Sequence, residues 1–85
     1  MRKIEYTIKD ELGIHARPAG VFSKLAKSFE SEITVAKGDK RANAAKLLAL
    51  MGMGIKHGDT ITVCADGTDE DIAIEKIQKF LTKNL

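Results

Sequence analysis

The chain has 85 residues, of which 44% are hydrophobic and 31% are charged, and its formal net charge is +2 at pH 7. This length allows one domain with one hydrophobic core, spanning residues 1–85, and no stretch approaches the ~18 consecutive apolar residues of a membrane span. The small net charge, with no basic run interleaved with aromatic residues, argues against nucleic-acid binding.

The first third of the chain has the periodicity of a strand followed by a helix. Residues 2–9 alternate between apolar and polar, which predicts a half-buried strand, and residues 10–13 break the pattern. From Ala16 to about Phe29, apolar residues recur at steps of three and four, as on one face of a helix. This face comprises Ala19, Phe22, Ala26 and Phe29, flanked by Val21 and Leu25.

The middle of the chain is predicted to be a hairpin followed by a short helix. Residues 32–37 alternate, residues 37–40 have the composition of a tight turn, and a short returning strand follows around Arg41. Asn43 is a plausible N-cap for a helix over roughly residues 45–52, which Gly52 and Gly54 bring to an end.

The last third is predicted to be a strand and a second long helix. Residues 60–65 alternate after a turn at residues 57–59, and Thr68 is a candidate N-cap for the final helix. The buried stripe of that helix comprises Ala73, Ile77, Phe80 and Leu81. The order β-α-β-β-α-β-α, with strands that expose one face to solvent, predicts an α+β fold in two layers with the helices on the other face of the sheet.

The segment Gly13–Pro18 places a histidine and an arginine where an extended stretch becomes a helix, because proline suits a first helical turn. Arg17 and the positive end of the helix dipole favour the neutral form of the His15 imidazole, which can attack phosphorus. An attached phosphoryl group would then meet the N–H groups of Ala16 and Arg17 and the guanidinium. The arrangement suits covalent acceptance and release of a phosphoryl group.

Other chemistries find less support in the sequence. From spacing alone, His15 could equally be a surface histidine that caps a helix, with Arg17 as a solvated charge. The histidines and Cys64 lack zinc-like spacing, and no glycine-rich phosphate loop or Gly-x-Ser-x-Gly motif occurs, so we expect no metal and no cofactor. A single cysteine permits no internal disulfide, and the N-terminus lacks a signal-peptide pattern, so we expect a cytoplasmic protein.

Residues 13–19, Gly-Ile-His-Ala-Arg-Pro-Ala, resemble the active-site signature of the HPr family, the histidine-containing phosphocarrier proteins of the bacterial phosphoenolpyruvate-dependent sugar phosphotransferase system. The likeness extends along the chain through residues 37–40, 51–55 and 65–67. It implies an open-faced sandwich of four antiparallel strands with three helices. It also implies that phosphorylated enzyme I phosphorylates His15 on Nδ1, that Arg17 steadies the phosphate, and that His15 then donates to enzyme II A domains. Such a protein is a carrier in a relay and not a stand-alone enzyme.

Three positions depart from the family pattern. Lys46 stands where many members carry a regulatory serine that a dedicated kinase phosphorylates, and lysine can neither accept that phosphate nor imitate its charge. We therefore expect phosphate transfer without this control, although Lys46 could also be an ordinary solvated residue. Leu12 replaces a small polar residue near the phosphate, which predicts an altered phosphohistidine lifetime. Gly20 costs the first helix up to about 1 kcal/mol relative to alanine.

The short helix is too apolar to bury all of its large side chains, which suggests a contact surface. By resemblance, Leu50 belongs to the core. The expected partner-binding residues are Gly20, Lys24, Lys46, Leu47, Leu48 and Met51. The expected partners of a monomeric protein are enzyme I, enzyme II A domains and regulatory proteins. A regulatory protein that acts mainly through contacts, or a carrier dedicated to another branch, is the alternative.

Overall fold

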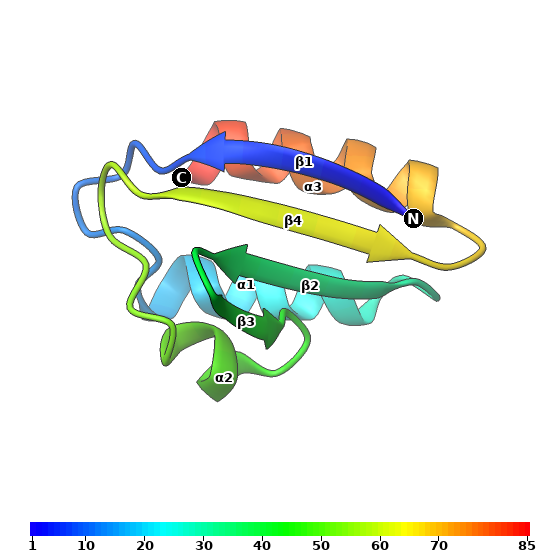
Figure 1. The fold of residues 1–85 in the computed structure, drawn as a ribbon, viewed down its shortest axis with the longest axis horizontal. Helices are drawn as coiled ribbons and strands as arrows, with labels where there is room; N and C mark the ends of the chain where they lie inside the picture. The colour runs from blue at the N-terminus through cyan, green and yellow to red at the C-terminus, as the bar shows by residue number, and fades with distance from the viewer.

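The elements follow one another in the predicted order β-α-β-β-α-β-α. The computed structural model, which describes residues 1–85, contains β1 (Arg2–Thr7), α1 (Ala16–Lys27), β2 (Glu32–Lys37), β3 (Lys40–Asn43), α2 (Leu47–Met51), β4 (Thr60–Asp66) and α3 (Glu70–Asn84) (Figure 1). None of the helices is both long enough and apolar enough to cross a membrane.

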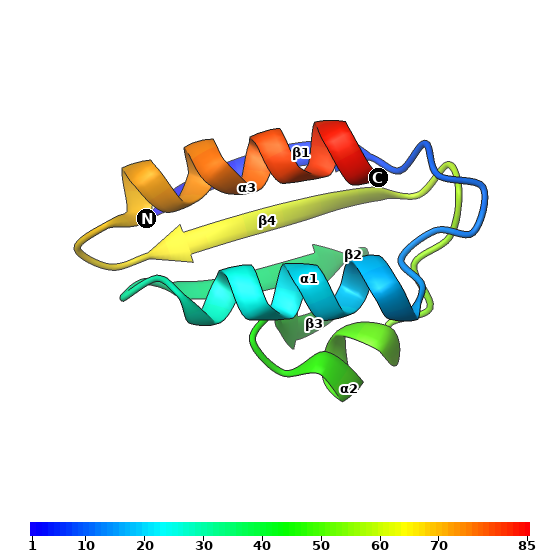
Figure 2. The same cartoon turned by 180° about the vertical axis from the view of Figure 1, so that it is seen from behind.

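The four strands form one antiparallel sheet in the order β1-β4-β2-β3. Val63 of β4 lies opposite Ile4 on one side and Val35 on the other, so the apolar positions of neighbouring strands fall on one face. Both α1 and α3 lie across that face, whereas α2 packs against α1 and β3 at the edge (Figure 2). The molecule is thus the open-faced α+β sandwich that the sequence predicts.

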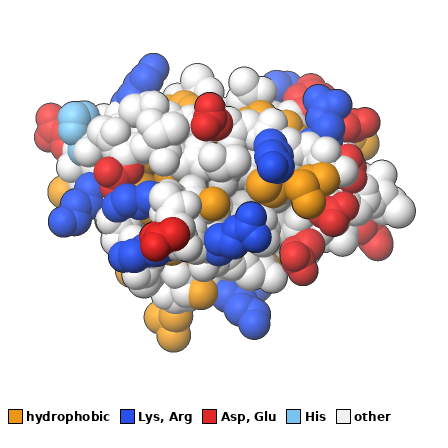
Figure 3. Space-filling model, in the orientation of Figure 1, with side chains coloured by type: hydrophobic (Ala, Val, Ile, Leu, Met, Phe, Trp, Pro, Cys, Tyr) orange, Lys and Arg blue, Asp and Glu red, His pale blue; other side chains and the backbone are white.

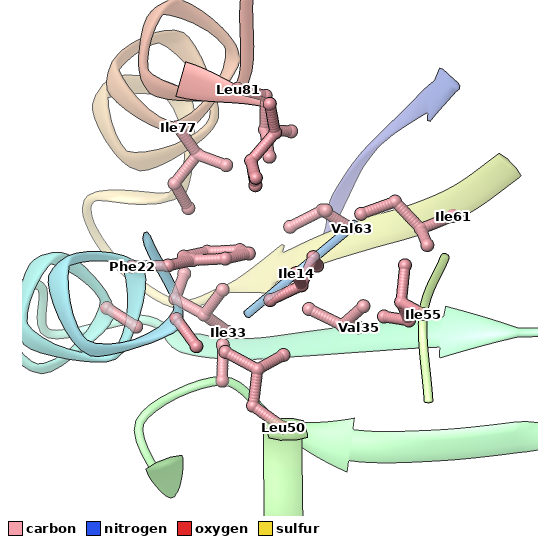
Figure 4. Packing of buried hydrophobic residues seen from close by; sticks show 14 of the residues in the cluster. Ile14, Phe22, Ile33, Val35, Leu50, Ile55, Ile61, Val63, Ile77 and Leu81 are labelled. Carbon is pink, nitrogen blue, oxygen red and sulfur yellow. The ribbon is translucent and has the colours of Figure 1, made fainter. Parts of the chain in front are cut away.

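The core fills the space between the sheet and the two long helices. It contains 19 buried hydrophobic residues from every layer, and side chains of α1 and α3 point towards those of the strands (Figure 4). Phe22 of α1 is fully buried, and its ring centroid lies 5.5 Å from that of Phe80 on α3. This pair links the two helices, and Phe80 also reaches the surface next to His15.

The apolar face of α1 differs from the prediction at Val21, and the buried side also includes Ser23, a polar residue that the apolar pattern does not mark. Val21 is 52% exposed, whereas Ser23 is buried. The Ser23 hydroxyl donates a hydrogen bond to the Ala45 carbonyl at 2.9 Å, which satisfies its polar atom and fastens α1 to the segment before α2. Periodicity of hydrophobic residues cannot identify a serine whose partner lies 22 residues away.

Both predicted N-caps of the later helices are wrong. The Asn43 side chain accepts a hydrogen bond from the Ala45 N–H in a preceding turn, and the N-cap of α2 is Lys46. The N-cap position of α3 belongs to Asp69, not Thr68. Its carboxylate accepts hydrogen bonds from the Glu30 and Ser31 N–H groups. In each case a side chain that could cap a helix binds backbone groups elsewhere.

The outer face of the sheet carries no helix and has a mixed surface. Lys, Arg, Asp and Glu side chains are interspersed over it, and hydrophobic side chains protrude at the lower edge where α2 lies (Figure 3). Single-sign charge does not dominate this face, in keeping with the small net charge of the chain.

Candidate functional site

His15 is the N-cap residue of α1 but does not use its side chain as a cap. Its backbone is extended, with φ −100° and ψ −179°, and the imidazole makes no capping hydrogen bond. Its carbonyl accepts the Ala19 N–H at 2.9 Å, which starts the helix. The expectation that His15 is the N-cap residue of this helix is confirmed for its backbone, whereas its imidazole forms no capping hydrogen bond.

The residues just before His15 fix the approach to the helix. Gly13 has φ +67°, a conformation that favours glycine, and a Cβ there would overlap the Ile55 carbonyl. Ile14 donates its N–H to that same carbonyl at 3.1 Å and buries its side chain in the core. Gly13 and Ile14 are thus fixed against the residues around Ile55, and this fixes the position of His15, which follows them.

A second anchor for the same loop comes from the end of the chain. The N–H groups of Lys9 and Asp10 donate to Leu85 at 2.6 and 2.9 Å, and the Leu85 side chain is buried. Asp10 also organises the turn that follows it: its carboxylate Oδ1 accepts the Leu12 N–H at 2.8 Å, and its carbonyl accepts the Gly13 N–H at 3.0 Å. The carboxylate therefore has a fixed position near the helix.

A pocket of roughly 250 Å³ opens beside the start of α1. It is lined by Asp10, His15, Arg17, Pro18, Val21, Phe80 and Asn84. The structure thus brings together three of the predicted site residues, His15, Arg17 and Pro18, while Ala16 lies exposed outside the lining. A larger hollow on the outside of α3, of about 390 Å³, shares no residue with this pocket and has no hydrophobic lining.

The pocket contains groups of both charges, with Arg17 and Asp10 in its lining beside His15. Arg17 is exposed and forms no ion pair, so its guanidinium is available. The N–H groups of Ala16 and Arg17 open the helix, have no preceding turn to bind, and donate to no loop carbonyl. The negative group of the pocket is Asp10, whose Oδ1 lies 4.0 Å from His15 Nε2. A helix N-terminus with free N–H groups and an unpaired arginine is an arrangement that favours an anion.

Four lining residues were not predicted as part of the site, namely Asp10, Val21, Phe80 and Asn84; Val21 was expected only beside the buried face of the first helix. Asp10 lies five residues before His15 in the segment that breaks the first strand, but the sequence does not show where its carboxylate points. Phe80 and Asn84 come from the last helix, and only the tertiary packing of α3 against α1 places them at the pocket. Their contribution could not be predicted from a motif.

The carboxyl groups with shifted pKa values have structural partners and do not line the pocket. Hydrogen bonds from the Ser31 hydroxyl and the Glu30 N–H lower the pKa of Asp69. The N-terminal ammonium lowers the pKa of Glu70, and Lys37 lowers that of Asp59. These three groups therefore contribute to folding and not to the chemistry at His15.

The short helix α2 has one buried and several exposed large apolar side chains, as the sequence predicts. Leu50 is buried, whereas Leu48 is 84% exposed and Leu47 and Met51 are each 38% exposed. Lys46 is exposed at the N-terminus of this helix, where its side chain makes no capping bond. The apolar side chains of α2 therefore form a surface next to α1, against which α2 packs.

The three remaining predicted positions are accessible. Lys24 is exposed on α1, Leu12 is 71% exposed, and a Cβ added at Gly20 would meet no atom within 4 Å. Packing within the chain therefore does not require a glycine at position 20.

Comparison with known proteins identifies the family. Residues 2–83 match the family model described as "PTS HPr component phosphorylation site". The phosphocarrier protein HPr of Mycoplasma genitalium is 44% identical over 85 residues, which cover 99% of this chain and 97% of that protein. A solved structure of a mycoplasma histidine-containing phosphocarrier protein superposes with a TM-score of 0.94 at 40% identity, covering 96% of this chain and 93% of that one.

A further solved structure, described as an HPr dimer from Thermoanaerobacter tengcongensis, has a TM-score of 0.78 at 34% identity and covers 98% of this chain and 95% of its own. The match of the family model over nearly the whole chain, the identity to the mycoplasma protein and the shared sandwich agree with one another. This chain belongs to the HPr family of phosphocarrier proteins of the phosphotransferase system.

Proposed function

We propose that this protein accepts a phosphoryl group on His15 Nδ1 from phosphorylated enzyme I and passes it to enzyme II A domains during sugar uptake, in the cytoplasm. The observation that carries the proposal is that the His15 imidazole, at the N-terminus of α1, forms no capping hydrogen bond and lines the same pocket as Arg17, which has no ion-pair partner. Family membership supports the phosphocarrier role.

The transfer needs no cofactor and leaves the proton balance of the ring unchanged. The Nδ1 lone pair of the neutral imidazole attacks phosphorus, and the bond between phosphorus and the donor breaks with its electron pair returning to the donor. The Ala16 and Arg17 N–H groups and the Arg17 guanidinium then stabilise the bound phosphate. In the next step the P–Nδ1 bond breaks, and its electron pair returns to Nδ1 as the acceptor takes the phosphoryl group.

Both types of partner are proposed to bind the surface beside His15. Leu47, Leu48 and Met51 supply exposed apolar contact area, and Lys24 and Lys46 supply positive charge around it. Gly20 leaves open space on α1, where a partner can approach closely. Flexible side chains such as leucine and methionine suit a surface that binds several partners in turn.

Lys46 is proposed to release this protein from control by serine phosphorylation, because it offers no hydroxyl at the start of α2. Incubation with the HPr kinase should label a Lys46→Ser variant and leave the wild type unlabelled near that position. Labelling of the wild type there would refute the proposal.

If Lys46 also attracts acidic partners, Lys46→Glu should lower the rate of association with enzyme I and make that rate less sensitive to salt.

One labelling experiment tests the proposed function. With enzyme I and labelled phosphoenolpyruvate, we expect one phosphoryl group per chain that is labile in acid and stable in base, and it should be lost in His15→Ala. Labelling that survives this substitution would refute the site. Enzyme II A domains added afterwards should discharge the label, whereas a label that none of them removes would favour a carrier for another branch.

A wild-type protein that binds partners but is never labelled would instead indicate a regulatory role. We expect the carrier to act as a monomer, and light scattering at the concentrations of the transfer assay tests this. A dimer, as in the Thermoanaerobacter structure, would contradict the expectation.

A further inference from the structure

We propose that Asp10 is a positioning residue for His15: its carboxylate holds the imidazole with the proton on Nε2, so that Nδ1 presents its lone pair to the incoming phosphorus. The proposal rests on the proposed phosphocarrier function and extends it to a residue outside the family motif. It starts from the 4.0 Å separation between His15 Nε2 and Asp10 Oδ1.

The carboxylate is placed by the backbone and not by the histidine. Asp10 uses three further hydrogen bonds: its N–H donates to Leu85, its carbonyl accepts the Gly13 N–H, and Oδ1 accepts the Leu12 N–H. Its side chain is 30% exposed, compared with 36% for that of His15. A negative charge that the loop already holds in position loses little conformational freedom when it contacts the ring.

The geometry selects one tautomer of the neutral ring. A carboxylate accepts hydrogen bonds and donates none, so it favours a proton on the nitrogen that faces it, which is Nε2. The remaining nitrogen, Nδ1, then carries the lone pair. The 4.0 Å separation is longer than a hydrogen bond, and such contacts shorten when a reacting complex forms.

The same contact assists the return of the phosphoryl group. Phosphorylation of Nδ1 while Nε2 keeps its proton places a positive charge on the ring, and the Asp10 carboxylate faces that charge. When the P–Nδ1 bond breaks, its electron pair returns to Nδ1 and neutral imidazole leaves, still protonated on Nε2. Asp10 thus holds the proton in place and takes part in no proton transfer.

Asp10→Asn is the informative variant, because the amide oxygen can still accept the Leu12 N–H while the charge is lost. In unphosphorylated protein at alkaline pH, where the imidazole is neutral, ¹⁵N chemical shifts of His15 report the two tautomers. We expect the ratio of the Nε2–H to the Nδ1–H tautomer to fall about two- to fivefold, which is the range of an exposed charge interaction. The transfer rate from enzyme I should fall by a similar factor.

Glu11→Gln is the matched control, since it removes the same charge from the adjacent, exposed residue of the loop. It should leave both the tautomer ratio and the transfer rate near those of the wild type, and Asp10→Glu should restore part of both. Urea unfolding of each variant reports whether the loop substitution disturbs the fold.

The outcomes separate this inference from the proposed function. An unchanged tautomer ratio in Asp10→Asn, a changed ratio with unchanged transfer, or faster transfer would each overturn the role of Asp10. A wild-type protein that enzyme I never labels would overturn the phosphocarrier function itself, and the tautomer measurement does not depend on that labelling.

Discussion

At the scale of single residues, the chemistry of the site depends on how the chain surrounds one imidazole. His15, Arg17 and Pro18 could be predicted from the sequence because they are neighbours whose spacing and helix-start position carry the signal. Asp10 could not, although it is also near in sequence, because the turn closed by its own side chain decides where its carboxylate points. Phe80 requires the packing of two helices.

The Asp69 carboxylate predicts a pH-dependent contribution to stability. Hydrogen bonds lower the pKa of Asp69 below the ordinary value of 3.8, and the bond from the Ser31 hydroxyl has a larger effect than the bond from the Glu30 N–H. The stabilisation is therefore complete above that value and is lost as the pH falls through the lower pKa of the folded protein. Urea unfolding at neutral pH and in acid should show that Asp69→Asn destabilises the protein at neutral pH and weakens its acid sensitivity.

Asp39→Asn serves as the control for this measurement, because Asp39 is exposed in the turn between β2 and β3 and its side chain has no hydrogen-bond or ion-pair partner. It should keep the pH dependence of the wild type. Equal pH profiles for Asp69→Asn and the wild type would contradict the role given to these hydrogen bonds.

At the scale of elements, strands and long helices could be predicted because their periodicity reflects a two-layer core. The helix starts were less predictable: Asn43 and Asp69 can bind any nearby N–H, and tertiary contacts decide which one they bind. The exposure of Leu47, Leu48 and Met51, with Leu50 buried, follows the prediction for α2. Their role as contact residues stays a prediction.

Two leucines of α2 should separate stability from partner binding. Leu50→Ala removes a buried side chain and should lower the free energy of unfolding by about 2–5 kcal/mol. Leu48→Ala, at an exposed position, should change it by less than about 0.5 kcal/mol but weaken binding to enzyme I. Urea unfolding and calorimetric titration measure the two effects. Undiminished binding by the Leu48 variant would remove Leu48 from the proposed interface.

Replacing each of two glycines near the site by alanine should change the free energy of unfolding in opposite directions. Gly13→Ala should cost about 2 kcal/mol or more of unfolding free energy, because φ is positive and the added Cβ would overlap the Ile55 carbonyl. Gly20→Ala should instead add about 0.5–1 kcal/mol, since the space around it in α1 is empty. Thermal unfolding compares the pair, and stabilisation by Gly13→Ala would contradict the anchoring described for the loop.

At the scale of the whole molecule, two segments that are distant in the sequence form hydrogen bonds to the loop between β1 and α1. The last residue of the chain binds the loop after β1, and the turn before β4 binds the residues just before His15. Neither link is visible in the sequence, since the partners are more than forty residues apart. The element order and the motif predict the sandwich and the position of the site, while these long-range hydrogen bonds determine its geometry.

The central claim is that Nδ1 of His15, the ring nitrogen that does not face Asp10, carries the phosphoryl group. The most direct test is NMR spectroscopy of protein labelled with ¹⁵N-histidine, after phosphorylation with enzyme I and phosphoenolpyruvate, to find which nitrogen couples to phosphorus. We expect ³¹P–¹⁵N coupling to Nδ1 of His15. Coupling to Nε2, which faces Asp10, or coupling only to His57 would contradict the account.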